Sequence, residues 1–292
     1  MNILLLGANG FIGQRLASVL AEAGHRLAKP TRHELDFLAL RRDAALPLLT
    51  GQDVVVNMVG AMRPHAARLE TLHHHAPAQL ARWSAENGVH RWVQLSALGA
   101  HADHPIPFLG SKGRGDDALL RLARDAALPP LRVHILRPSL VFGAGGASAT
   151  LFAHLARLPC LLLPHANVRI QPVHVEDVAR ALARLVTAPP PALPVTIEAG
   201  GAEALTLATW VTLLRTRLHR HPAPVIAPLP TALLRPLLPL AARLTRGMVS
   251  ADSLALLAAG AAVADNAPFT HLLGQAPRSP AQFFPHPLGD TP

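Results

Sequence analysis

The sequence has no tyrosine and only one cysteine, Cys160. A single cysteine excludes a disulfide framework and any multi-cysteine zinc or iron–sulfur site. Because Cys160 lies between a proline and a run of leucines, we expect it to be buried and unreactive. Without tyrosine, a reaction that needs a phenolic proton donor has no such group in this chain. Only 15% of the residues are charged and 50% are hydrophobic, which excludes a long disordered chain.

Lysine is also scarce, since Lys29 and Lys112 are the only two among 27 basic residues. The formal net charge is +9, but the arginines are spread along the chain without a basic block. Aromatic residues, at 4%, offer few stacking surfaces for single-stranded nucleic acid. We therefore predict that the chain has no nucleic-acid partner.

Long uninterrupted apolar runs are missing too. The first seven residues lack the basic segment of a secretory signal, and the most apolar stretch, 225–242, contains an arginine and four prolines. We therefore expect no membrane-spanning helix and a cytoplasmic location. An alternative is peripheral contact at the inner face of the membrane through 229–246, where leucines and prolines are mixed with arginines.

Short apolar runs alternate with segments of helical periodicity, which predicts an α/β fold with a Rossmann-type doubly wound parallel sheet. Strands are expected at 3–6, 26–28, 53–59, 91–96, 133–136, 168–173 and 195–198. Helices are expected at 11–23, 77–87, 112–127, 150–157, 175–186, 207–217 and 250–263. We expect 1–143 with about 168–198 to form the nucleotide-binding domain, and about 144–167 with 199–292 to form a smaller mixed α/β lobe.

A glycine turn, G-A-N-G-F-I-G, lies between the first strand and the first helix. Its first glycine permits a tight turn, the second lets the backbone approach a pyrophosphate, and the third lets helix and strand pack closely. The start of the helix then presents free N–H groups and a partial positive charge to phosphates. We therefore predict dinucleotide binding by Gly7, Asn9, Gly10, Phe11, Ile12 and Gly13.

The end of the second strand bears on the choice of cofactor. An NAD-preferring site places an acid there to bind the ribose hydroxyls, whereas this chain has no acid between Lys29 and Glu34. Arg32 can pair with a 2′-phosphate through two parallel hydrogen bonds. The sequence therefore favours NADP(H), with NAD(H) as the alternative and a merely solvated Arg32 as the simpler interpretation.

Three motifs together resemble the extended and atypical short-chain dehydrogenase/reductases, the NAD-dependent epimerase/dehydratase-like proteins. They are the Gly-x-x-Gly-x-x-Gly spacing, R-P-S-L-V-F-G at 137–143 and Q-P-V-H-V-E-D-V-A at 171–179. The run 250–273 is similar to the closing segment of the complex I accessory-subunit-like subgroup. The resemblance covers nearly the whole chain. It implies that further cofactor contacts come from Asp36, Phe37, Val59, Gly60, Lys112 and Pro138.

The resemblance also implies a catalytic set of serine, tyrosine and lysine. Ser96 and Lys112 match the serine and the lysine, but Phe108 stands four residues before Lys112, where the family has its tyrosine. A phenyl ring has no proton to give, and a positioned general acid contributes about 10²–10⁴-fold to such a step. One interpretation is a nucleotide-binding protein with a sensing, assembly or structural role. The other is an NADPH-dependent reductase of an apolar quinone-like or conjugated substrate that uses Lys112 and Ser96.

Histidines offer further candidates. His101 and His104 lie in the loop before Lys112 and could replace the missing acid, although polar loop residues are the commoner case. The tract 73–75 suggests a metal site, but adjacent residues point in different directions, so we predict no metal. The resemblance places a substrate pocket against the C-terminal lobe, and its expected lining is mostly apolar, which favours an apolar small molecule or a protein partner. That lining is 141–146, 161–169 and 222–240.

Overall fold

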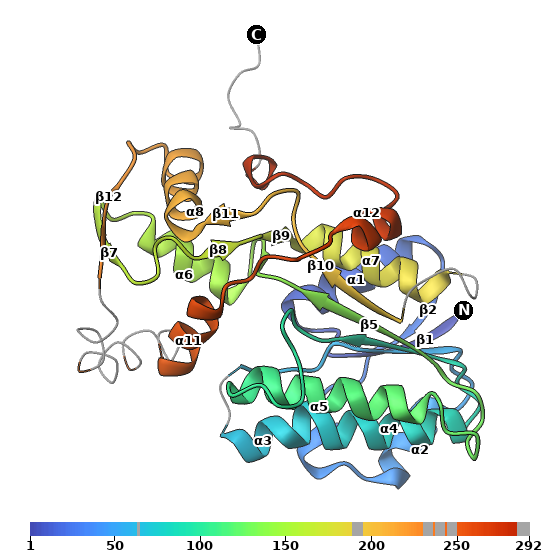
Figure 1. The fold of residues 1–292 in the computed structure, drawn as a ribbon. Coiled ribbons are helices and arrows are strands. Elements are labelled where there is room, and N and C mark those ends of the chain that lie inside the picture. Colours follow the sequence, from blue (N-terminus) through green and yellow to red (C-terminus); the bar gives the residue numbers. More distant parts are fainter. Residues whose placement is uncertain (63–64, 189–194, 230–235, 237–242, 244–249, 285–292) are drawn as a thin grey trace. The chain divides into compact units, whose positions relative to one another are not determined.

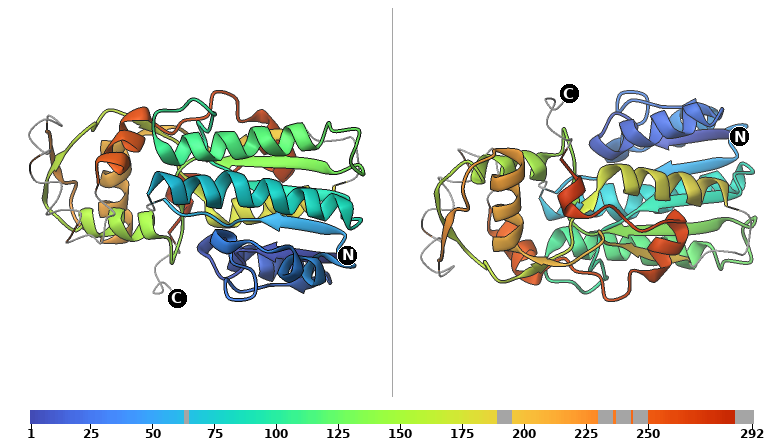
Figure 2. Two further views of the ribbon diagram at one scale, coloured as in Figure 1. Left: turned by 90° about the horizontal axis from the view of Figure 1, so that it is seen from below. Right: turned by 90° about the horizontal axis from the view of Figure 1, so that it is seen from above.

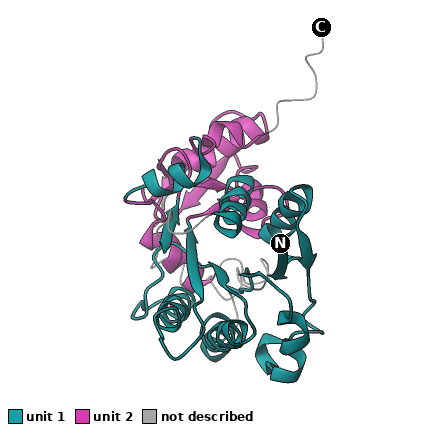
Figure 3. Ribbon diagram, turned by 90° about the vertical axis from the view of Figure 1, so that its right-hand side faces the viewer, with its two compact units in different colours: residues 1–138, 175–199, 265–275 teal, residues 139–174, 200–264, 276–292 magenta. Residues whose placement is uncertain are grey.

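The computed structural model describes residues 1–62, 65–188, 195–229, 236, 243 and 250–284. The chain divides into two compact units (Figure 3). Unit 1 comprises 1–138, 175–199 and 265–275, and unit 2 comprises 139–174, 200–264 and 276–292. These bounds differ from the expected domains in that 139–143 and 168–174 belong to unit 2, whereas 265–275 belongs to unit 1.

Unit 1 is built on a six-stranded sheet in the order β10-β5-β4-β3-β1-β2, and every pair of neighbours is parallel. The strands are β1 (Asn2–Leu6), β2 (Arg26–Ala28), β3 (Val54–Asn57), β4 (Arg91–Leu95), β5 (Arg132–Pro138) and β10 (Thr196–Ala199). Because β2 and β3 pair with opposite sides of β1, the strand order reverses at β1. Ligands of open α/β sheets bind at the carboxyl ends of the strands beside such a reversal.

Helices cover both faces of this sheet (Figure 1). One face carries α1 (Phe11–Glu22) and α7 (Val175–Thr187). The other carries α2 (Arg42–Leu49), α3 (Ala66–Glu70), α4 (Ala76–Glu86) and α5 (Pro107–Leu122), of which α4 and α5 lie side by side (Figure 2). Unit 1 also contains the 3₁₀ turn η1 (Phe37–Ala39), the π-helical turn η2 (Thr71–His75) and α12 (Ala267–Leu273). The predicted α/β doubly wound parallel sheet is confirmed.

The central strands are apolar on both faces because helices cover both. Residues 3–5 and 54–56 have no exposed side-chain surface. Trp92 on β4 is likewise fully buried, in a cluster with residues of α4 and β5. Each fully buried aliphatic side chain of this kind contributes about 1.5–3 kcal/mol. This burial is what a short uninterrupted Val/Leu run indicates for a parallel sheet.

Helix α5 starts at Pro107, five residues before the start that the sequence predicts. Pro107 occupies the first turn, where a missing N–H costs nothing, whereas the glycines that follow have low helix propensity and hide the helical pattern. Those glycines permit close packing. A Cβ at Gly113 would lie 2.1 Å from the carbonyl carbon of His101, and one at Gly115 would lie 1.9 Å from the carbonyl oxygen of His73.

The π-helical turn η2 has its cause in Pro77, in the first turn of α4. Proline has no N–H, so it cannot donate the α-helical hydrogen bond to the carbonyl of His73. Ala76 donates to the carbonyl of Thr71 instead, which is the five-residue spacing of a π-turn. The wider turn directs His73 into the protein, where it is 1% exposed.

Unit 2 is a mixed α/β lobe of short elements, as predicted. Its elements are β6 (Val141–Phe142), α6 (Ala147–Leu155), β7 (Cys160–Leu163), β8 (Arg169–Ile170), β9 (Val173–His174), β11 (Leu205–Thr206), α8 (Leu207–Leu213), the π-turn η3 (Leu214–Leu218), β12 (Val225–Pro228), α11 (Ala251–Ala259) and η5 (Pro280–Gln282). Phe142, Trp210 and Phe283 form the centre of its core. The single strand expected at 168–173 is wrong, because Gln171-Pro172 separates β8 from β9.

Other expectations have different outcomes. Cys160 is exposed rather than buried, because β7 alternates buried and exposed residues and Cys160 is on the exposed side. The three prolines at 189–191 and most of 229–246, the segment expected to allow membrane contact, lie outside the described residues. Among the residues that the structure describes, no helix is long and apolar enough to cross a membrane.

The close approach of α5 to the carbonyl of His73 generates a stability prediction. Gly115→Ala places a Cβ where that carbonyl lies, so the helix must move, and we expect a loss of about 1–3 kcal/mol in the free energy of unfolding. Chemical denaturation measures it. Arg121→Ala, at an exposed position of the same helix, is the control and should change stability by less than about 0.5 kcal/mol. Equal stability of the Gly115→Ala protein and the wild type would contradict this packing.

Candidate functional site

The glycine turn follows β1 at the point where the strand order reverses. Gly7 has φ +82°, a backbone conformation that favours glycine, and a Cβ there would lie 3.0 Å from the backbone of Met58. A Cβ at Gly13 would lie 2.2 Å from the carbonyl oxygen of Gly7, which is impossible without moving the helix. Gly10 donates its N–H to Gly7 at 3.0 Å and closes the turn. The turn thus has the compact geometry that the motif predicts.

The first turn of α1 is open to an anion. Gly10 caps the helix without a side chain, and the first turn contains no acid. Gln14 donates to the carbonyl of Gly10 at 3.0 Å, so the N–H groups of 11–13 have no partner within the helix. The carbonyl of Asn9 accepts the side-chain amide of Gln14 at 3.1 Å. Free N–H groups and the helix dipole together favour a phosphate here.

Polar side chains are buried at the carboxyl ends of β3 and β4. The side-chain oxygen of Gln94 accepts from Asn57 and from the indole N–H of Trp92, both at 3.0 Å. Asn57 in turn accepts the N–H of Val59 at 3.1 Å. This network fixes the chain that leaves β3 toward Gly60.

Lys112 lies on the inner face of α5 and is only 5% exposed. Its ammonium donates to the carbonyl of Leu95 at 2.9 Å. Burial lowers the pKa of Lys112 to about 8, against the opposing effect of Asp116. A Cβ at Gly60 would lie 3.4 Å from Nζ, so the ammonium lies beside the backbone of Gly60.

His73 lies beside this lysine, although the sequence analysis did not distinguish it from its neighbours in the tract 73–75. The N–H of Ala61 donates to its Nε2 at 3.2 Å, and its Nδ1 lies 2.9 Å from the hydroxyl of Ser111. Ser111 in turn donates to the carbonyl of Phe108 at 3.0 Å. This pattern assigns the ring proton to Nδ1. Burial, with Lys112 adding repulsion, lowers the pKa of His73 to about 3.

His73 is therefore neutral at physiological pH, and its one ring N–H, at Nδ1, donates a hydrogen bond to the hydroxyl of Ser111. It orders the loop at Ala61 and cannot act as a general acid. The sequence signal that could have identified it is Pro77, which changes the helix at this turn.

Ser96 follows β4, as the motif predicts, and it is 5% exposed. Its hydroxyl donates to Oδ2 of Asp116 at 2.7 Å, and Arg137 donates to the same oxygen at 2.9 Å. Burial raises the pKa of Asp116, while the Arg137 guanidinium, the Ser96 hydrogen bond and Lys112 oppose the rise. The proton of Ser96 is thus engaged by a buried carboxylate that the sequence reasoning did not identify.

Phe108 lies on α5 one turn before Lys112, so both side chains belong to the same side of the helix. The Phe108 ring meets the imidazole of His73 edge-on, with 5.6 Å between centroids. His101 and His104 have rings 4.8 Å apart, and Nδ1 of His104 accepts the N–H of Ile106. That nitrogen is used within the loop, which favours the simpler interpretation of these two histidines.

The loop after β2 presents the residues expected to select the cofactor. Arg32 is exposed. The carboxylate of Glu34 accepts both the N–H and the hydroxyl of Thr31, which lowers the pKa of Glu34. Asp36 is exposed and caps η1 through the N–H of Leu38, whereas the side chain of its neighbour, residue 37, is buried in the core.

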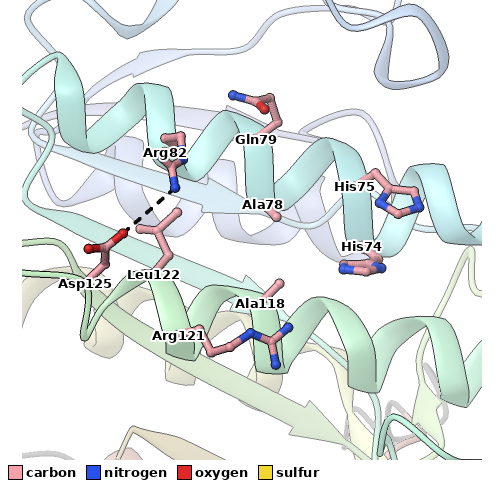
Figure 4. Close-up of a pocket in the computed structure, with 9 residues that line it drawn as sticks. All are labelled: His74, His75, Ala78, Gln79, Arg82, Ala118, Arg121, Leu122 and Asp125. Carbon is pink, nitrogen blue, oxygen red and sulfur yellow. Dashed lines mark ion pairs between the residues drawn. The ribbon is translucent and has the colours of Figure 1, made fainter. Parts of the chain in front are cut away.

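The outward side of the histidine tract lines a surface pocket of about 530 Å³ between α4 and α5 (Figure 4). His74 and His75 stack with centroids 4.4 Å apart, and ligand atoms of both lie within 4.8 Å of Glu70. Arg114 holds the carboxylate of Glu70 through several hydrogen bonds, so this acid is already charge-balanced. The expectation of no metal stays a prediction.

The predicted residues fall into two groups. The first group lies between the end of β4, helix α5 and η2. It comprises Ser96, Phe108, Lys112 and Gly60, which are linked through their contacts with α5. The glycine turn follows β1, Arg32 follows β2 and Pro138 is the last residue of β5, all at the same edge of the sheet. A dinucleotide fits these features, because the cradle excludes side chains and the open helix start offers donors to an anion.

Comparison with known proteins agrees with the geometry. The model of the NAD dependent epimerase/dehydratase family matches residues 3–195. The chain is 25% identical over 254 residues to NADH dehydrogenase (ubiquinone) 1 alpha subcomplex subunit 9, mitochondrial, of Arabidopsis thaliana, a match covering 78% of this chain and 60% of that protein. Ceramide reductase of Caulobacter vibrioides is 26% identical over 201 residues, covering 64% of this chain and 61% of that protein. The chain thus spans about three fifths of the length of these relatives.

The fold also matches solved structures. MoeE5 in complex with UDP-glucuronic acid and NAD superposes with a TM-score of 0.68 at 18% identity, over 96% of this chain and 94% of that one. The resemblance to extended short-chain dehydrogenase/reductases and to the complex I accessory-subunit-like subgroup is confirmed. The chain belongs to the NAD dependent epimerase/dehydratase family and has the Rossmann-type dinucleotide-binding unit of that family.

Proposed function

We propose that this chain binds NADPH through unit 1 and serves a sensing, assembly or structural role without interconverting alcohols and ketones. The observation that carries the proposal is Phe108 on α5, one turn before the buried Lys112. At this spacing the Lys112 ammonium would lower the pKa of a tyrosine at position 108, but the side chain there is the hydrocarbon ring of Phe108. Nucleotide binding needs the Lys112 ammonium, whereas carbonyl reduction needs the phenolic proton that this chain lacks.

Nucleotide binding is supported by features that do not depend on the lost phenol. The glycine turn and the open start of α1 would hold the pyrophosphate through backbone N–H groups. Lys112 would hold the nicotinamide ribose as an ammonium. When bound, the cofactor's nicotinamide can supply a hydride, and this chain's residues position and shield it.

Ser96 adds a second argument against carbonyl chemistry. A serine that polarises a substrate carbonyl must direct its proton at that carbonyl, but the Ser96 hydroxyl donates to Asp116 at 2.7 Å. Hydrogen bonds to charged groups are worth about 1.5–3 kcal/mol. The serine would have to give up this bond to serve a substrate.

A reductase of an apolar substrate is the second candidate, and the pKa of Lys112 favours it. With a pKa of about 8, the buried ammonium can release a proton near neutral pH more readily than an ordinary lysine. The proton would pass from Nζ to the substrate atom that becomes basic after reduction, and water would restore it. Similarity to a ceramide reductase agrees with an apolar substrate.

The preference for NADPH rests on Arg32, which is exposed after β2, and on Glu34, whose carboxylate is turned back onto Thr31. Arg32→Glu replaces a phosphate-binding group by a repelling one, so we expect NADPH affinity to fall by about tenfold or more while NADH affinity changes little. Fluorescence titration with both nucleotides measures this. The matched control is Arg26→Glu, an exposed arginine at the other end of β2, which should leave the ratio unchanged. An unaltered preference in the Arg32 variant would refute this role.

The role of Lys112 predicts a pH dependence. If its ammonium holds the ribose, NADPH affinity should fall by about tenfold between pH 7 and 9, as the group with a pKa of about 8 loses its proton. Lys112→Arg should abolish the fall, because arginine stays charged, and Lys29→Arg should retain it. A fall of the same size in the Lys112→Arg protein would show that another group titrates.

The same lowered pKa acts on stability with the opposite sign. In the unfolded chain the lysine keeps its proton up to the ordinary lysine pKa of 10.5, whereas the folded chain loses it near 8. The contribution of Lys112 to unfolding free energy therefore rises between these two pH values. Deprotonation of Lys112 therefore does not itself destabilise the fold over the pH range of the binding titration.

The missing acid can be tested by restoring it. Phe108→Tyr places a phenol one turn before Lys112, and we expect NADPH-dependent reduction of a ketone or quinone to rise by about 10²–10⁴-fold over the wild-type background. Oxidation of NADPH followed by absorbance measures it, with Phe108→Leu as the control for altered packing. Wild-type turnover as fast as that of the Phe108→Tyr protein would favour the second candidate.

A further inference from the structure

Unit 2 exposes large apolar side chains next to arginines on two neighbouring segments, 157–162 and 217–225. The exposed fractions are 48% for Leu158, 61% for Leu162 and 67% for Val225. We call the set formed by these residues, Cys160, Leu218, Arg157, Arg217 and Arg220 the basic apolar patch; its other members are exposed as well. Large apolar groups gathered in one place mark interaction surfaces more often than single exposed ones do.

Hydrogen bonds hold the two segments together. β7 and β12 pair in parallel and lie side by side (Figure 1), with Cys160 opposite Val225. The N–H of Val225 donates to the carbonyl of Pro159 at 2.9 Å. Arg215, which is 7% exposed, donates to the carbonyls of Ala156, Arg157 and Pro222. The strand members of the patch, Cys160, Leu162 and Val225, are therefore held on hydrogen-bonded backbone.

The exposure follows from the strand pattern. Leu161 and Leu163 point into the core of unit 2, so Cys160 and Leu162 must face away from it. A strand with leucine on both faces is the pattern of a strand covered on both sides. Among the described residues, none covers the outer face enough to bury Leu162.

The charged residues within the two segments are all arginines. The sequence of unit 2 contains nine arginines but only three acids, Glu203, Asp252 and Asp290, and none of these lies in either segment. Arg220 adopts φ +55°, an uncommon conformation for a residue with a side chain.

We propose that the basic apolar patch docks onto an anionic lipid bilayer, with its leucines and valine entering the acyl boundary and its arginines meeting lipid phosphates. Interfacial segments combine apolar and cationic residues in this way. A protein partner fits less well, because protein interfaces are enriched in aromatic residues and the patch has none. The proposal concerns unit 2 and does not rest on nucleotide binding by unit 1.

The single cysteine of the chain lies in the patch, which provides a direct reporter. A polarity-sensitive fluorophore attached to Cys160 of the full chain should shift to the blue with phosphatidylglycerol-containing vesicles and not with pure phosphatidylcholine vesicles. Co-sedimentation of the unlabelled chain with the same vesicles gives the affinity. The binding should weaken as salt concentration rises, since the attraction is partly electrostatic.

Variants separate the two parts of the patch. Reversing Arg157 and Arg220 to glutamate should weaken vesicle binding by at least tenfold, and Leu158→Ser with Leu162→Ser should do so even at low salt. The matched controls in unit 1 are Arg124→Glu and Leu38→Ser, which change exposed residues of the same types and should keep binding within about twofold.

Thermal melts establish that each variant is folded before binding is compared. Absence of vesicle binding by the folded wild type overturns the proposal. Binding that persists in both patch variants, or that the unit 1 controls remove equally, also overturns it. A blue shift of the Cys160 label that grows with the concentration of this chain and needs no vesicles would also overturn the proposal. It would assign the patch to an interface between copies of the chain.

Discussion

The site depends on how closely α5 approaches its neighbours. Gly113 and Gly115 bring the helix so near to the backbone of His101 and His73 that no Cβ fits between them. This approach buries Lys112 against the end of β4 and places Ser96 within hydrogen-bond distance of Asp116. The burial of a cation is costly unless its protons are bonded, which explains why the carbonyl of Leu95 and the carboxylate of Asp116 accompany it.

Much of unit 1 could be predicted because its signals are local. The apolar runs of β1 and β3 and the glycine turn each carry their own pattern, and the structure has the sheet that they predict. The start of α5 could not be predicted, because the glycines that make its packing possible are the residues that weaken a helical pattern. Tertiary contact overrides local propensity at this position.

The candidate site shows the same division. Ser96, Phe108 and Lys112 could be placed by motif, but motifs do not report what a side chain bonds to. His73 depends on a π-turn caused by a proline four residues later, and Asp116 depends on a contact between α5 and β4. The exposure of Cys160 depends on which face of β7 meets the core. Each of these is a relation between segments and not a property of one segment.

Binding and chemistry place different demands on such a site. The glycine turn offers backbone N–H groups and contains glycines that cannot accept a Cβ, so the pyrophosphate contacts proposed for it depend little on side chains elsewhere. Proton transfer depends on one acid in one place, and a single change to phenylalanine removes it. None of the nearby groups replaces that acid simply, since His73 is held neutral by burial and Ser96 is held by Asp116. A chain of this kind can therefore lose carbonyl reduction while keeping nucleotide binding. Lys112 is a stronger acid in this buried position than in water, and both the proposed nucleotide binding and any remaining proton transfer would depend on it.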